Sequence, residues 1–235
     1  MSLPVVKYCP STLAEGFDTY SRTGLNRVFR GKKVSHILPH SAPTFDPQIE
    51  GLFEKNRKYL SLSGIQEKFS VVLDKNKLRL PNEGERSNYI LKPIPNAGKK
   101  ADQMPANEHL TMQIARQVYG IETAENALIF FKDGSPAYIT KRFDVKDDGS
   151  KLAQEDFALD DGLLPRHLAQ GKISQQFAML AEQAEISQKK FLEMLNLMLS
   201  RSEIVEKLVG VSFLNETTKR NYLQSYQGRL KQLAK

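Results

Sequence analysis

Short apolar runs separated by turn signals fill residues 59–145 and surround one stretch of helical periodicity. Strands are predicted near residues 69–73, 77–80, 88–92, 128–131 and 137–140. The turn Asp74-Lys75-Asn76 separates the first two, and Asp133-Gly134 between the last two is the strongest hairpin signal in the chain. This pattern predicts a twisted antiparallel sheet with one helix packed against it, in an α+β fold.

The helix is predicted over residues 107–119, where apolar side chains recur every fourth position. These are Leu110, Ile114 and Val118, with Met112 and Ala115 beside them. Asn107 is the predicted N-cap, Glu108 suits the positive end of the helix dipole, and Gly120 is suited to close the helix.

The flanking parts differ in character, which predicts three regions. Residues 1–58 are predicted to be an irregular extension with a short helix near 46–56. Residues 59–145 form the β-rich unit, and residues 146–235 a polar connection followed by helices from about residue 173. The helical faces are predicted from three groups of apolar residues: Phe177, Leu180, Ala181 and Ala184; Phe191, Met194, Leu195, Met198 and Leu199; Ile204, Leu208 and Val211. A last helix carries Tyr222, Tyr226 and Leu230.

Composition and charge narrow the class of protein. The chain of 235 residues is 40% apolar and 26% charged, which is ordinary for a globular protein, and no apolar run reaches membrane-spanning length. Its net charge of +7 lies in residues 1–100, which hold 17 Lys and Arg against 9 Asp and Glu. A single cysteine, Cys9, excludes an intramolecular disulfide and suits the cytoplasm. The excess charge suits nucleic acid, an acidic partner or nucleotide phosphates, and it equally suits an ordinary solvated surface.

The stretch from Ser61 to Lys68 (Ser-Leu-Ser-Gly-Ile-Gln-Glu-Lys) precedes the first predicted strand, and Lys92 ends the third. Small residues let backbone N–H groups approach anionic oxygens, and a strand lysine supplies a positive charge. A loop, a strand lysine and a helix glutamate follow one another in this order in protein kinases.

Five segments together resemble the HipA-like serine/threonine protein kinases, the toxins of type II toxin–antitoxin modules. They are Ser61 to Lys68, Ile90-Leu91-Lys92-Pro93, Asn107-Glu108-His109-Leu110, Lys141-Arg142-Phe143-Asp144 and Gln154-Glu155-Asp156-Phe157. The short N-terminal segment is similar to the HipT variety, in which a small companion protein supplies the first subdomain. The resemblance implies a kinase-like β-rich N-terminal lobe and an all-α C-terminal lobe.

The resemblance also implies roles for single residues. The loop with Ser63, Gly64, Gln66 and Lys68 would cover the phosphates of ATP. Lys92 would bind the α- and β-phosphates with Glu108 as its partner. Lys141, Arg142 and Phe143 would lie at the hinge that receives adenine. Ser61 and Ser63 match serines that the family phosphorylates on itself, which makes the chain an expected phosphoprotein.

The resemblance does not extend to the catalytic motifs of the family. The family carries an Asn-x-Asp-x-His-x-x-Asn loop and a later Tyr-Asp pair, which supply the catalytic aspartate and the Mg²⁺ ligands. Neither is present, and no aspartate follows Asp161. Phe157 to Gly162 resembles a join between segments that are normally far apart. We therefore expect a truncated C-terminal lobe, no assignable catalytic or metal-binding residue, defective catalysis, and helices whose apolar faces are left exposed.

The function implied is an ATP-dependent kinase toxin that phosphorylates a protein such as an aminoacyl-tRNA synthetase. Implied partners are a helix-turn-helix antitoxin, through which alone DNA is contacted, and a small HipS-like companion subunit. The alternative is a kinase-derived binding module without chemistry. Single residues also have simpler readings: the serine-rich loop as a turn, Lys92 as an edge-strand lysine, Glu108 as a first-turn charge, and Phe143 as a core residue.

Overall fold

The computed structural model describes residues 5–42, 68–95, 99–146, 150, 152 and 173–234. Within these residues it is an α+β fold with one five-stranded sheet and six α-helices. The strands are β1 Phe69–Asp74, β2 Lys77–Arg79, β3 Tyr89–Pro93, β4 Asn126–Phe130 and β5 Pro136–Lys141. The helices are α1 Arg22–Phe29, α3 Met104–Gln117, α5 Ile173–Gln183, α6 Gln188–Leu199, α7 Ser202–Gly210 and α8 Glu216–Leu233, with a 3₁₀ turn, η2 Ala101–Gln103, before α3.

The sheet is antiparallel throughout, with the strand order β2-β1-β3-β5-β4. All five predicted strands are confirmed to within two residues, and so is the hairpin, in which Gly134 takes the left-handed φ of 88°. β3 lies in the middle of the sheet, between β1 and β5. The reading of Lys92 as an edge-strand lysine is therefore wrong.

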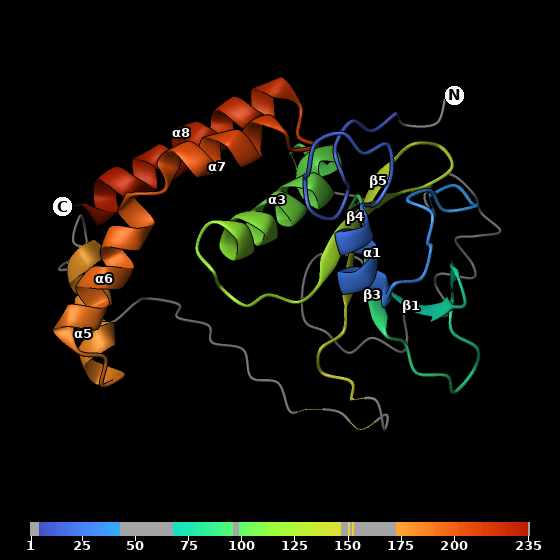
Figure 1. Ribbon diagram of the computed structural model, residues 1–235, viewed down its shortest axis with the longest axis horizontal. Coiled ribbons are helices and arrows are strands. Elements are labelled where there is room, and N and C mark those ends of the chain that lie inside the picture. The colour runs from blue at the N-terminus through green and yellow to red at the C-terminus, as the bar shows by residue number, and fades with distance from the viewer. Residues whose placement is uncertain are drawn as a thin grey trace.

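One face of the sheet is covered by the N-terminal part of the chain (Figure 1). Here the backbone runs beside β4, with Leu128 donating to the Pro10 carbonyl at 2.7 Å and Leu38 donating to the Phe130 carbonyl at 2.7 Å. The side chains that fill this core come from both layers: Tyr20, Val28, Phe29, Val34 and Leu38 on one side, and Val71, Tyr89, Leu91, Ile129 and Ile139 on the other.

Helix α1 lies in a region that the sequence predicted to be irregular, and that prediction is wrong for Arg22–Phe29. Ser21 caps the helix by accepting a hydrogen bond from the Gly24 N–H at 3.1 Å. Arg30 ends it in a left-handed conformation. Val28 and Phe29 are fully buried, so tertiary packing stabilises a helix whose own propensity is low. The helix predicted near 46–56 lies outside the described residues.

Helix α3 covers the opposite face of the sheet, against β4 and β5 (Figure 1). Leu110, Ile114 and Val118 are buried as predicted, and Gly120 follows with φ 67°. The prediction of Asn107 as the N-cap is wrong, because the helix begins at Met104 with Gln103 in the cap position. Proline is well suited to the first turn, where its missing N–H is not needed, and Pro105 lies there.

The C-terminal helices form two pairs that differ in burial. In α7, Val205 and Val209 are fully buried, and the predicted residues Leu208 and Val211 pack against the same cluster, whereas the predicted Ile204 is 39% exposed. In α5 and α6 only Ala181 is buried, and Phe177 and Leu192 are 49% and 46% exposed. The expected exposure of apolar faces is thus observed for α5 and α6 but not for α7. No described helix has the length and apolarity needed to cross a membrane.

Candidate functional site

Lys92 and Glu108 form an ion pair between the sheet and the helix that covers it. The Lys92 Nζ lies 2.5 Å from the Glu108 Oε1. Their side chains are 19% and 25% exposed, so the pair is partly shielded from water yet still accessible from one side. Lys92 is on β3, and Glu108 is in the second turn of α3. Glu108 is therefore more than a helix-dipole charge, because it orients the one lysine of this central strand.

Tyr138 completes this end of the site. It lies opposite Lys92 in the β3–β5 register, and its ring centroid is 5.3 Å from the Lys92 Nζ. A cation near an aromatic ring is stabilised electrostatically. Burial, together with the Glu108 charge, raises the pKa of the Tyr138 hydroxyl well above its usual value. The hydroxyl therefore stays neutral and adds no second negative charge to that of Glu108 beside Lys92.

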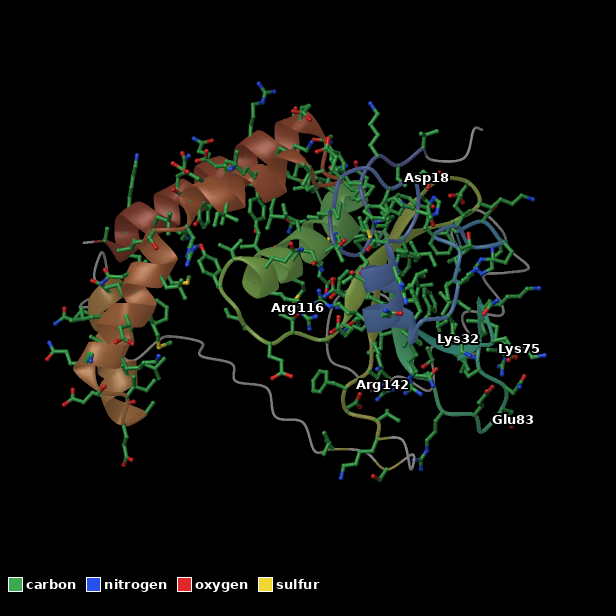
Figure 2. The ribbon with its side chains drawn as sticks, in the orientation of Figure 1. Asp18, Lys32, Lys75, Glu83, Arg116 and Arg142 are labelled. Atoms are coloured by element: carbon green, nitrogen blue, oxygen red, sulfur yellow. The ribbon has the colours of Figure 1, made fainter. Side chains whose placement is uncertain are left out.

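Helix α3 is fixed to the sheet by polar contacts next to the ion pair. The buried His109 ring donates from Nε2 to the Ser11 carbonyl at 3.2 Å. Gln113 donates to the Asn126 side chain at 2.9 Å. One turn further, Arg116 contacts Glu125 at 2.6 Å, and Figure 2 shows Arg116 between the helix and the loop that leads to β4. These contacts set the distance of Glu108 from the sheet.

A polar pocket of about 480 Å³ opens at the end of β3 and β5 that is opposite Lys92. Its walls include Ser70 of β1, Ser87 and Arg142. Arg142 follows Tyr138 by four residues and comes directly after β5, so at about 3.4 Å per residue it lies about 14 Å from Tyr138 on the same side of the extended chain. The ion pair and the pocket therefore lie at the two ends of one side of the sheet.

Arg142 and Asp144 form a second, more deeply buried ion pair at this end. The Arg142 guanidinium donates to both Asp144 oxygens, at 2.9 and 2.5 Å, and the two side chains are 9% and 7% exposed. Arg142 Nη1 is also 3.4 Å from the Ser87 hydroxyl, which donates to Ser70 at 3.1 Å. This network joins the chain leaving β5, where Figure 2 labels Arg142, to the strands beside it.

Phe143 lies between these two residues and is 66% exposed, so the reading of Phe143 as a core residue is wrong. Lys141 is half-buried at the end of β5, and its N–H donates to the Glu125 carbonyl at 2.7 Å. The three predicted hinge residues, Lys141, Arg142 and Phe143, therefore lie at the end of the sheet that borders the pocket.

The remaining predicted loop residues have separate outcomes. Ser61, Ser63, Gly64 and Gln66 lie outside the described residues. Lys68 is described and directly precedes β1. Sequence reasoning missed Tyr138 and the Arg142–Asp144 pair. The Arg-Phe-Asp alternation did carry a signal for the pair, because residues two apart in an extended chain point to the same side.

The described residues do not offer the carboxylate ligands that a magnesium ion needs. Within the described ranges no group of three or more His, Cys, Asp or Glu side chains could hold a metal ion. Asp144, which follows the sheet directly, already has both carboxylate oxygens engaged by Arg142.

Comparison with known proteins adds one finding. The family model of the HipA-like C-terminal domain matches residues 60–202, which is more than half of the chain. No curated protein matches the sequence. The matched region begins at the predicted loop and includes the Lys92–Glu108 pair, the pocket, and helices α5 and α6.

Proposed function

Because this chain belongs to the family of HipA-like C-terminal domains, we propose that it is a kinase-derived protein that binds ATP at the Lys92–Glu108 site. The observation that carries the proposal is the ion pair. Lys92, on the central strand of the sheet, lies 2.5 Å from Glu108, on the helix that packs against this sheet. A lysine oriented in this way suits the phosphates of a nucleotide.

The rest of the side that holds Lys92 supports the same proposal. The polar pocket includes Arg142, which lies about 14 Å along the chain from Tyr138, the residue beside Lys92, and this separation suits a nucleotide with its phosphates on Lys92 and its base near Arg142. The loop from Ser61 to Lys68 would close over the phosphates, and Lys141 would border the base.

The reaction of the family is phosphoryl transfer to a serine or threonine of a protein such as an aminoacyl-tRNA synthetase. We propose that this chain has lost it, because the sequence contains no aspartate with the Asn and His companions of the family's catalytic loop. The absence of that loop and of the Mg²⁺ ligands is best explained by a missing central segment. Without them most of the electrostatic stabilisation of the transition state is lost.

A second function is favoured by one observation. Helices α5 and α6 expose apolar side chains, among them Phe177, Leu192 and Met194. Contiguous exposed apolar surface is typical of protein–protein contact sites. A kinase-derived module that binds an antitoxin or a HipS-like companion subunit in the cytoplasm would use such a surface, and DNA would be reached only through the antitoxin.

Titration with ATP tests the first proposal. We expect weak but measurable binding by calorimetry, and at least about tenfold weaker binding by Lys92→Ala, because a charge-assisted contact to phosphate is lost. The matched control is Lys77→Ala, which removes an exposed lysine of the same sheet on β2. Equal affinity of the wild type and Lys92→Ala would contradict the proposed site.

A further inference from the structure

Helix α3 is enclosed between the sheet and the helix pair α7–α8 (Figure 1). Its residues Leu110, Ile114 and Val118 share one apolar cluster with Val205 and Val209 of α7. The two valines are fully buried. The helix that carries Glu108 is therefore held on two sides, by the sheet on one and by the C-terminal helices on the other.

Polar contacts join α8 and the N-cap residue of α8 to α3 and to the residues that flank α3 at both ends. The Asn215 N–H donates to the side-chain oxygen of Gln103 at 2.8 Å. The hydroxyls of Thr111 and Tyr222 lie 3.2 Å apart. The hydroxyls of Tyr119 and Tyr226 lie 2.7 Å apart. Such directional contacts, spread along the helix, resist its rotation as well as its translation.

A small rotation of α3 is enough to break the ion pair. A side-chain atom lies about 5 Å from a helix axis, so a rotation of about 20° displaces the Glu108 carboxylate by about 2 Å. A displacement of that size separates two groups that are 2.5 Å apart. The N-terminus of α3 has no side-chain cap of its own that would oppose this motion.

We propose that the α7–α8 pair is a positioning element for α3 and that Tyr222 and Tyr226 are positioning residues that keep Glu108 on Lys92. The pair thereby couples the C-terminal helices to the site, although it contributes no group to the site itself. The consequence for nucleotide binding rests on the proposed function, whereas the effect on the ion pair does not.

The test measures the ion pair directly and without nucleotide. The double variant Tyr222→Phe/Tyr226→Phe removes two hydroxyls and keeps both rings. Purified protein is treated with a limiting amount of an acetylating reagent, and mass spectrometry gives the rate at Lys92 relative to the exposed Lys77 of the same molecule. We expect this ratio to rise about threefold or more in the variant, because a less firmly held Glu108 leaves the amine more accessible.

Tyr20→Phe is the matched control. It removes a buried hydroxyl that donates to the Leu128 carbonyl at 2.6 Å, and Tyr20 lies on the other side of the sheet from α3. Its Lys92 ratio should equal that of the wild type. An unchanged ratio in the double variant would overturn the proposal, and so would an equal rise in Tyr20→Phe, which would show general loosening. Failure of the wild type to bind ATP would refute the proposed function and leave this result intact.

Discussion

At the scale of single residues, His109 is the titratable group that burial perturbs most clearly. The ring is almost fully buried, and burial lowers its pKa to about 4 despite the hydrogen bond to Ser11. Since the unfolded chain binds this proton near pH 6.5, folding stability should be complete above that pH and fall as the pH drops toward 4. The loss expected from this residue is about 3 kcal/mol.

His109→Gln tests this expectation, because an amide can still donate to the Ser11 carbonyl but takes up no proton. Denaturant unfolding between pH 4.5 and 7 should show a shallower dependence on pH for the variant. A variant with the same pH dependence as the wild type would show that other groups cause the acid sensitivity.

Residues of the site were predictable to different degrees. Lys92 and Glu108 could be named from their motifs, and the structure brings them together. Tyr138 could not, because its place beside Lys92 depends on the register of β3 with β5, strands that are far apart in the sequence. The spacing of Arg142 and Asp144 indicates that both lie on one side of an extended chain, but the burial of their ion pair is not determined by the local sequence.

At the scale of elements, two glycines in helices should respond oppositely to the same change. A Cβ on Gly24 in α1 would lie 2.9 Å from the Ser11 Cβ, whereas one on Gly228 in α8 would meet no atom within 4 Å. Gly24→Ala should therefore destabilise the fold by about 1–2 kcal/mol through overpacking. Gly228→Ala should stabilise it by up to about 1 kcal/mol through helix propensity. Thermal unfolding of both variants measures the difference, and a stabilising Gly24→Ala would contradict the close packing of α1.

Elements with local sequence signals were predicted, whereas α1, which depends on close packing, was not. The hairpin around Gly134 and the periodic helix α3 depend on local signals and are confirmed. Helix α1 contains Thr23 and Gly24, which favour helices weakly, and it forms because Gly24 lets it approach the loop at Ser11. The prediction for α7 was incomplete for a similar reason: Leu208 and Val211 pack against the cluster as predicted, but the contact with α3 buries Val205 and Val209 in place of Ile204.

At the scale of the whole molecule, the C-terminal helices divide into a part that contributes to the core and a part that does not. Val205→Ala should cost about 2 kcal/mol of unfolding free energy, because it leaves a space in the cluster between α3 and α7. Phe177→Ala should cost less than about 1 kcal/mol, since the ring is already half exposed. Chemical denaturation compares them, and an equal or larger loss for Phe177→Ala would show that α5 is covered.

We propose that this chain keeps a nucleotide site of the kinase type and lacks the groups that would use it. The most direct measurement is mass spectrometry of Ser61 and Ser63 after incubation of the isolated protein with ATP and Mg²⁺. We predict no phosphate on either serine, because the acceptor residues are present while the aspartate base and the metal ligands are not. Addition of an intact homologous kinase checks that these serines can be modified. Phosphate on Ser61 or Ser63 in the isolated protein would contradict the account and direct attention to the aspartates between Asp144 and Asp161.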